Sequence, residues 1–166
     1  STVKRALAVI ARSGGKITET EVLVPRPTPK PPPHEQWNPG IPCQKIAAKD
    51  PAWTWSNKWM DDKGRMVSTN AGCEAILKFT GVAVALIGRL DQQGGRATIY
   101  LDHRELGFAD AYIVPNTHDN ALWHTYGLAP GDHTLRLVTR PDADVRSKGH
   151  QVSIERAVIY RAPERK

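Results

Sequence analysis

Charged and amide side chains gather in three polar stretches of the sequence. They are Arg89, Asp91, His118, Asp119, Asn120, Arg140, Asp142, Asp144 and Arg146. Aspartate and asparagine accept or donate hydrogen bonds in pairs, and a guanidinium forks across two adjacent oxygens. Neighbouring sugar hydroxyls offer such pairs, and the arginines also suit an acidic sugar such as a uronate or a sulfated glycan. The three stretches therefore indicate a carbohydrate site, with ordinary solvated loops as the alternative.

A second candidate for sugar contact is the run Trp53-Thr54-Trp55-Ser56-Asn57-Lys58-Trp59, where three indole rings stand among polar residues. In an extended segment, alternation places Trp53, Trp55 and Trp59 on one side. The apolar C–H faces of sugars stack on such rings. The run therefore predicts either a stacking platform for a sugar or an apolar plug at the bottom of the fold.

The sequence contains no motif for nucleophilic or zinc-dependent catalysis. G-x-S-x-G, H-E-x-x-H and C-x-x-C are absent, and the six histidines show no metal-ligand spacing. A glycosidase needs two carboxylates at a set separation across a cleft, which a small sandwich rarely supplies alone. We therefore expect a non-catalytic chain.

Two cysteines, Cys43 and Cys73, leave two possibilities open. One is a disulfide, which would close a loop of about thirty residues, stabilise the fold by roughly 3–4 kcal/mol and fit an oxidising compartment. The other is two unrelated buried thiols.

Short β-rich runs separated by turn residues follow one another through the second half of the chain. They cover residues 74–79, 82–88, 96–102, 105–114, 121–126, 133–140 and 151–160. In the third run, Ala97, Ile99 and Leu101 share one face, which is typical of a strand with one buried side. Turn signals every 8–12 residues or so indicate a β-sandwich.

If these strands run alternately up and down, every second connection lies at the same end. The polar connections 89–95, 115–120 and 141–150 then converge on one rim, and the tight turns 103–104 and 128–132 lie at the opposite end. Long loops on a rigid fold are the usual place for a binding site. We interpret Gly94-Gly95 as hairpin chemistry.

The first fifty residues have a different character. Residues 1–24 hold two β-rich runs around a Ser-Gly-Gly-Lys turn and predict a β-hairpin, packed on the main domain or part of a neighbour. Residues 25–50 start with a proline-rich stretch and predict a stiff linker or a strap over the surface. Pro42 to Lys49 is a weak helical candidate. The sandwich is assigned to residues 51–162.

Composition limits the partners of this 166-residue chain. Its net charge of +6 and pI of about 9.5 first suggest a nucleic-acid ligand. Lysine and arginine are spread along the chain and interleaved with acids, as in Asp61-Asp62-Lys63, so we expect no nucleic-acid binding. No apolar run reaches the roughly 18 residues of a membrane span. The start at Ser1 lacks a signal-peptide core, and we expect one module of a longer protein.

A series of phrases resembles the galactose-binding-like jelly-roll modules of bacterial polysaccharide-degrading enzymes and esterases. The phrases are Phe79-Thr80-Gly81-Val82-Ala83-Val84, Gly94-Gly95-Arg96-Ala97-Thr98-Ile99-Tyr100-Leu101-Asp102, Leu122-Trp123-His124, Gly127-Leu128-Ala129-Pro130-Gly131-Asp132-His133-Thr134-Leu135 and Val152-Ser153-Ile154-Glu155-Arg156-Ala157-Val158-Ile159-Tyr160. The resemblance covers about residues 53–160. It implies an all-β fold, a jelly-roll β-sandwich, here with an N-terminal hairpin and a Pro-rich linker.

The same resemblance carries expectations about function. It implies a non-catalytic carbohydrate-binding module that targets an attached glycoside hydrolase, lyase or esterase to a polysaccharide, in a secreted or periplasmic protein. The alternative is a structural or docking sandwich of a multidomain hydrolase that binds no glycan itself. No cofactor is required. Many relatives carry a structural calcium ion, which is therefore possible here, although its ligands cannot be matched residue by residue.

Overall fold

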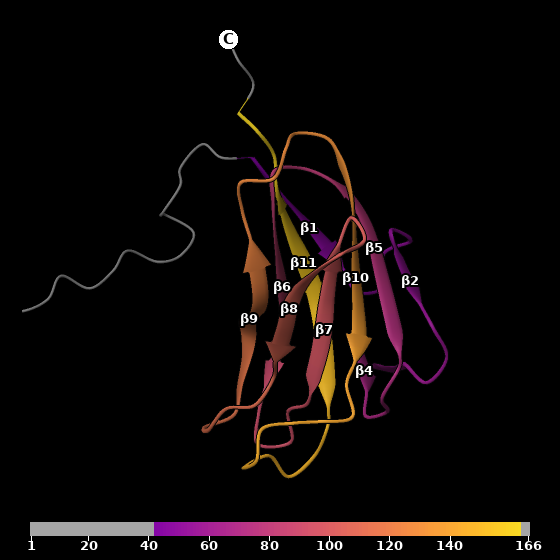
Figure 1. The fold of residues 1–166 in the computed structure, drawn as a ribbon, viewed down its shortest axis with the longest axis vertical. Helices are drawn as coiled ribbons and strands as arrows, with labels where there is room; N and C mark the ends of the chain where they lie inside the picture. The colour runs from indigo at the N-terminus through magenta and orange to yellow at the C-terminus, as the bar shows by residue number, and fades with distance from the viewer. Residues whose placement is uncertain (1–41, 164–166) are drawn as a thin grey trace, which may run out of the picture. The chain divides into compact units, whose positions relative to one another are not determined.

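A computed structural model of the chain describes residues 42–163, which form two antiparallel sheets (Figure 1). The strands are β1 (Cys43–Ala47), β2 (Trp53–Trp55), β3 (Met60–Asp62), β4 (Arg65–Ser68), β5 (Glu74–Thr80), β6 (Ala83–Leu90), β7 (Arg96–Leu101), β8 (Arg104–Asp110), β9 (Thr117–Thr125), β10 (Asp132–Thr139) and β11 (Val152–Tyr160). Sheet A has the order β3-β4-β11-β6-β9, with β1 also paired to β11. Sheet B has the order β2-β5-β10-β7-β8.

The two sheets bury one face each against a shared core. In β7 and β10, every second residue is buried, and Ile99, Leu135 and Leu137 have no exposed surface. Leu86 and Ile154 of sheet A are equally buried in the same cluster. Period-two apolar strands that fold back on each other reach this arrangement because each sheet must cover its apolar face. The predicted all-β sandwich is confirmed.

The beginning of the described chain differs from its prediction. Residues 43–47 form β1, which pairs antiparallel with residues 156–160 of β11, so the weak helix predicted for Pro42 to Lys49 is wrong. Ile46 enters the core, and the backbone gains a full ladder on the edge of sheet A. This strand therefore belongs to the sandwich and not to the linker expected up to residue 50. The hairpin predicted for residues 1–24 and the strap over 25–41 lie outside the described residues.

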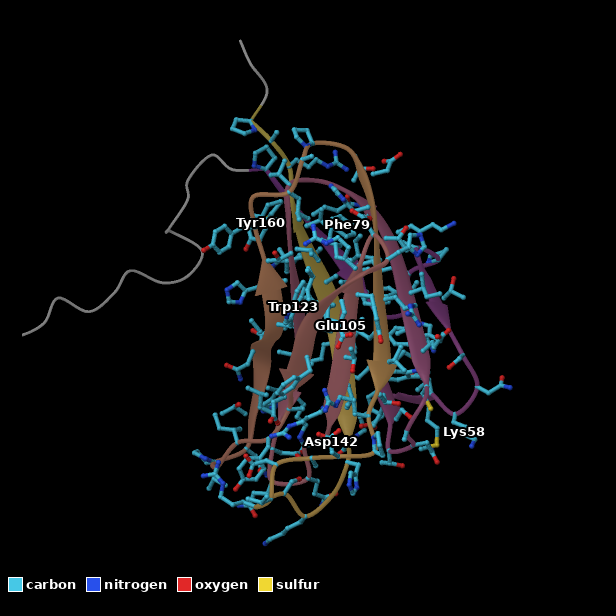
Figure 2. The ribbon with its side chains drawn as sticks, in the orientation of Figure 1. Lys58, Phe79, Glu105, Trp123, Asp142 and Tyr160 are labelled. Carbon is cyan, nitrogen blue, oxygen red and sulfur yellow. The ribbon has the colours of Figure 1, made fainter. Side chains whose placement is uncertain are left out.

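The chain enters and leaves the sandwich at one end. Cys43 at the start of β1 pairs with Tyr160 at the end of β11, and the Arg161 amide donates to the Pro42 carbonyl at 3.0 Å. Figure 2 shows Tyr160 near the upper end of the molecule and Asp142 at the lower end. We call the end that holds Tyr160 the entry end and the opposite one the loop end.

The two cysteines are not joined. Cys43 is exposed on β1, whereas Cys73 is buried in the core directly before β5, and both thiols are free. The disulfide alternative is therefore wrong, and of the two thiols only Cys73 has the burial expected in the other alternative. Among residues 42–163, no helix is long and apolar enough to cross a membrane.

Candidate functional site

Three connections meet at the loop end, as the predicted alternation of strand direction requires. The predicted loop 115–120 is wrong in its bounds, however, because β9 begins at Thr117 and contains His118, Asp119 and Asn120. The Asp91 amide donates to the Ala111 carbonyl at 3.0 Å, which ties the β6–β7 connection to the β8–β9 connection. The Lys148 and Gln151 amides donate to the carbonyls of residues 92 and 93 at 2.8 Å, which adds the β10–β11 connection. The turns at 103–104 and 128–132 lie at the entry end, also as predicted. The reason is that β7 ends there, β10 begins there, and the two strands pair in antiparallel register.

Gly94 and Gly95 serve close packing and not a hairpin turn. The segment that contains them crosses from sheet A to sheet B, since β6 and β7 belong to different sheets. A β-carbon on Gly94 would lie 1.9 Å from the Ala111 carbonyl oxygen, and one on Gly95 would lie 2.4 Å from the backbone of His150. The three connections can therefore approach so closely only because both side chains are missing.

A pocket lies beside this rim, on the outer face of sheet A. Its lining comes from Lys63, Gly64, Arg65, Arg89, Asn116, Thr117, His118 and Glu155, and its volume is about 620 Å³. Leu90 and Met66 pack against the core, so their neighbours Arg89 and Arg65 point away from it. The pocket thus spans β4, β11, β6 and β9 in the half of the sheet nearer the loop end, and its volume suits a small ligand.

Polar side-chain atoms on β9 and β11 lie buried without a protein partner in the described part of the chain. Among the described residues, the buried Thr117 Oγ1, Ser153 Oγ and Arg156 Nε make no hydrogen bond. Thr117 lines the pocket itself, and the other two lie on β11 on either side of the pocket residue Glu155. A buried polar atom without a partner costs about 1–3 kcal/mol, so a ligand hydroxyl that completes such a bond gains that amount back.

The pocket lining is positively charged overall. Lys63, Arg65 and Arg89 face a single lining carboxylate, Glu155. The arginine side chains are held in place from outside the lining, since Arg89 Nε lies 3.0 Å from Asp91 Oδ2 and Arg65 Nη2 lies 2.6 Å from Asp62 Oδ2. Guanidiniums positioned in this way can donate further hydrogen bonds to a ligand.

Of the predicted polar residues, Arg89 and His118 line the pocket, and their neighbours support the loop end. Asp91 is 7% exposed, and its Oδ1 accepts from the Gln93 amide at 2.8 Å, so this carboxylate is a structural element of the turn. Asp119 has a left-handed backbone in β9 and forms an ion pair with Arg156. The Asn120 side chain donates to the His118 carbonyl at 3.0 Å.

The remaining predicted residues lie away from the pocket, in the connection between β10 and β11 or directly before it. Arg140 and Asp142 pair at 2.7 Å beside the outer face of sheet B. Asp144 and Arg146 pair with each other at 2.9 Å, and the hydrogen bond from Arg146 lowers the pKa of Asp144 to about 2. These acids are therefore charged at neutral pH and engaged with arginine, and the structure divides the predicted rim into two separate groups.

The tryptophan platform is not formed. Trp53 and Trp59 are 5% and 8% exposed in the core, where neither ring offers a face to a ligand, so this part of the site prediction is wrong. Trp55, half-buried, stacks on Trp53 with centroids 4.8 Å apart and meets Trp59 edge to face at 4.9 Å. The indoles of Trp55 and Trp59 donate to backbone carbonyls at 3.0 Å. The alternative of burial in the sandwich holds, along the β2 edge of sheet B.

A calcium site finds no matching set of acidic ligands. Within residues 42–163, no three histidine, cysteine, aspartate or glutamate side chains lie close enough together to hold a metal ion. Asp91, the buried acid of the loop end, already uses both carboxylate oxygens on Arg89 and the Gln93 amide. Calcium also takes backbone and amide oxygens, so the possible structural calcium ion stays a prediction, and no role is derived from it.

Sequence reasoning missed most of the pocket lining. Lys63 and Gly64 form the turn between β3 and β4, and both have positive φ angles. The Asp-Lys-Gly sequence there is a recognisable turn signal that could have added this segment. Glu155 could not have been found, because only the strand order of sheet A brings β11 between β4 and β6.

The chain matches no protein-family model and no curated protein sequence. Among solved structures, it is similar to a two-domain esterase active on acetylated mannans and co-crystallized with mannopentaose, with a TM-score of 0.59, 9% identity, and coverage of 96% of this chain and 45% of that one. It is also similar to a Paenibacillus xanthan lyase, with a TM-score of 0.50, 15% identity, and coverage of 84% of this chain and 14% of that one. A CBM36-1 domain of a multidomain xylanase from the hindgut metagenome of Trinervitermes trinervoides gives a TM-score of 0.49 at 12% identity, over 74% of this chain and 100% of that one.

These comparisons concern shape. The chain spans between 34% and 45% of the length of the carbohydrate esterases that it matches. Identities of 9% and 15% identify a fold and leave ligands and reactions open. The predicted resemblance is thus confirmed at the level of the fold: residues 42–163 form a jelly-roll β-sandwich, and parts of these two enzymes are similar to it in structure.

Proposed function

We propose that this chain is a non-catalytic carbohydrate-binding module whose site is the pocket on the outer face of sheet A. The observation that carries the proposal is the pocket itself, about 620 Å³ in volume and lined by three cations, a carboxylate, an amide, an imidazole and one hydroxyl. The buried hydroxyl of Thr117 has no partner among the described residues, and a sugar hydroxyl supplies both the donor and the acceptor that such a group can use.

The charge of the pocket favours an acidic glycan. Lys63, Arg65 and Arg89 outnumber the single carboxylate of Glu155, so a sugar carboxylate or sulfate gains charge-assisted hydrogen bonds there. A neutral sugar gains only the weaker neutral bonds. We therefore propose a polysaccharide that contains uronate or sulfated units as the partner, and neither a nucleic acid nor a membrane.

The position of the pocket suits an accessory module. The pocket lies in the half of sheet A nearer the loop end, whereas Pro42 and Arg161 lie side by side at the entry end. We propose that a catalytic domain is attached through one of these flanks, at the end of the sandwich opposite the loop end. Even weak binding then raises the effective concentration of the attached enzyme at its substrate. We propose this role in a secreted or periplasmic enzyme.

Binding without catalysis follows from the groups that line the pocket. Glu155 is the single carboxylate among them, and hydrolysis of a glycosidic bond by the usual route needs a second carboxylate across the sugar. Glu155 Oε2 also lies 3.7 Å from Arg156 Nη1. We assign Glu155 to the orientation of a sugar hydroxyl.

The direct test compares two substitutions in the pocket with two matched ones elsewhere. We expect Lys63→Gln and Arg89→Gln each to weaken binding to polygalacturonate by roughly tenfold, since each removes a charge-assisted contact. The controls are Lys78→Gln on β5 and Arg104→Gln on β8, which remove exposed charges of the same kind from sheet B. Affinity electrophoresis and titration calorimetry measure the effect.

Two results would overturn the proposal. In the first, neither polygalacturonate nor a sulfated glycan retards the wild-type chain in affinity electrophoresis. In the second, the pocket variants bind as tightly as their controls while all four variants keep the thermal midpoint of the wild-type chain. Methyl-esterified polygalacturonate separates charge from shape, because it keeps the sugar ring and removes the negative charge; we expect markedly weaker binding to it.

A further inference from the structure

The outer face of sheet B carries a band of arginine and aromatic side chains that the pocket does not use. Arg136 pairs across the sheet with Tyr100, Thr98 pairs with Phe108, and Arg96 pairs with Asp110. The residues between them on β7 and β10, such as Ile99 and Leu137, are buried, so these side chains share the opposite, outer face. We call Arg96, Tyr100, Phe108, Arg136 and Arg140 the arginine–aromatic band.

Each guanidinium of the band lies against a ring. The central guanidinium carbons of Arg96 and Arg140 lie 5.1 and 5.0 Å from the centroid of Phe108. That of Arg136 lies 4.1 Å from the centroid of Tyr100. These distances are within the range of cation–π attraction. Phe108 is nevertheless 46% exposed, so much of its ring remains open to solvent.

Carboxylates fix the same guanidiniums from the other side. Arg96 Nε lies 2.8 Å from Asp110, and Arg140 Nε lies 2.7 Å from Asp142, which also accepts from Arg96 at 3.3 Å. Arg136 Nη1 lies 2.8 Å from a third carboxylate, Glu74. Three arginines are thus balanced by three carboxylates. The band is therefore preorganised, and its own charges balance.

We infer that the arginine–aromatic band is a second glycan-binding surface, one that takes an uncharged polysaccharide chain laid across sheet B. A neutral sugar chain offers apolar ring faces and pairs of hydroxyls. The exposed ring of Phe108 can stack on the apolar faces, and the fixed guanidiniums and carboxylates can donate to and accept from the hydroxyls. An acidic chain gains no net charge attraction from the band, since its three arginines and three carboxylates cancel.

Protein docking is the competing occupant of such a surface, because arginine and aromatic residues are also enriched at protein interfaces. The balance of charge favours the sugar. Every charged group of the band is satisfied within the chain, so a protein partner would gain nothing from charge complementarity, whereas neutral hydroxyls use the spare donor and acceptor positions without disturbing the pairs.

The test uses the full chain with Phe108→Ala and Tyr100→Ala, and Lys78→Gln as a control on the same sheet. The probes are soluble mannan, xylan free of uronate, and hydroxyethylcellulose in affinity electrophoresis. We expect the wild-type chain to be retarded by at least one probe and Phe108→Ala to bind it roughly threefold to tenfold more weakly, as expected for loss of one stacking contact. Tyr100→Ala should weaken it as well, and Lys78→Gln should have no effect.

The two proposed binding surfaces can be tested independently of each other. Arg89→Gln should leave binding to the neutral probe unchanged, and Phe108→Ala should leave binding to polygalacturonate unchanged. The inference is overturned if no neutral probe retards the wild-type chain, if both ring variants bind as the wild type does, or if Arg89→Gln removes neutral binding. It is equally overturned if the wild-type chain ignores these probes and instead dimerises in sedimentation, with Phe108→Ala monomeric, since the band is then a protein interface.

Discussion

At the scale of single residues, His133 shows how a side chain at the entry end joins two turns. Its Nδ1 lies 2.6 Å from Asp102 Oδ2 and its Nε2 lies 2.7 Å from the Ala129 carbonyl oxygen. Both neighbours are acceptors, so the imidazole satisfies both only when it carries two protons. The hydrogen bond to Asp102 accordingly raises the pKa of His133 above its ordinary value of 6.5, with a smaller contribution from Asp132.

This arrangement predicts a fold that loses stability as the solution becomes alkaline. Because the folded pKa of His133 exceeds the unfolded value, its contribution is complete below about pH 6 and is lost as pH rises through the folded pKa. For Asp102, desolvation raises the pKa but hydrogen bonds from His133 and Thr134 outweigh it, and the net lowered pKa matters only in acid. We expect the thermal midpoint to fall by a few degrees between about pH 6 and pH 8.5.

The matched comparison is His133→Gln against His150→Gln, which changes an exposed imidazole at the loop end. The first substitution should flatten the decline of the thermal midpoint with pH, and the second should retain it. Scanning calorimetry at four or five pH values measures both. A decline of equal size in the two variants would contradict this role of His133.

At the scale of elements, the sequence predicted the strands from β5 to β11 because their signal is local, whereas it missed the short strands β1 to β4. Alternation in residues such as Ala97, Ile99 and Leu101 places β7 at Arg96–Leu101 against a prediction of 96–102. The convergence of the three connections at the loop end could be predicted from the alternation of strand direction alone. The pocket did not, since its lining depends on which strands become neighbours, and β11 meets β4 and β6 only in the folded sheet.

The same limit explains two errors of interpretation. The indoles of Trp53 and Trp59 stand among polar residues in the sequence, but β2 pairs with β5 and turns them into the core. Gly94-Gly95 has the composition of a hairpin, yet its segment crosses between the sheets. In both cases the deciding contact joins residues that are distant in the chain. A local sequence pattern carries no information about such a contact.

The segment that crosses between the two sheets allows a prediction about Gly94. An alanine β-carbon there would lie 1.9 Å from the Ala111 carbonyl oxygen and 2.4 Å from the Tyr112 amide nitrogen, so backbone must shift and the bridge to Gln151 is disturbed. We expect Gly94→Ala to lower the free energy of unfolding by about 2–3 kcal/mol. Gly72→Ala is the control, because its φ of +76° costs only about 1 kcal/mol and nothing lies near its added carbon. Urea unfolding measures both, and an equal cost would contradict the packing role.

At the scale of the whole molecule, the two polar surfaces lie on opposite outer faces of the sandwich, the pocket on sheet A and the arginine–aromatic band on sheet B. The lining of the pocket on sheet A has three cations and one carboxylate, and the band on sheet B has three arginines and three carboxylates. In both places the arginines also pair with nearby acids, which for the pocket lie outside the lining. The net charge of +6 is a property of the entire chain and adds a diffuse attraction for any polyanion. Binding to an acidic glycan therefore contains a part that depends on total charge and a part that depends on the pocket.

Salt separates these two parts. Raising the ionic strength from about 0.05 M to about 0.5 M shortens the screening length well below the size of the molecule, so we expect the wild-type chain to lose roughly tenfold in affinity for polygalacturonate. The double variants Lys63→Gln/Arg89→Gln and Lys78→Gln/Arg104→Gln lower the net charge equally, by two. If the pocket is the site, the first pair binds weakly and shows a shallower salt dependence, while the second pair keeps nearly the wild-type dependence. Identical salt dependences for the two double variants would show that the total charge of the chain causes the attraction for polygalacturonate. The pocket would then have no specific part in it.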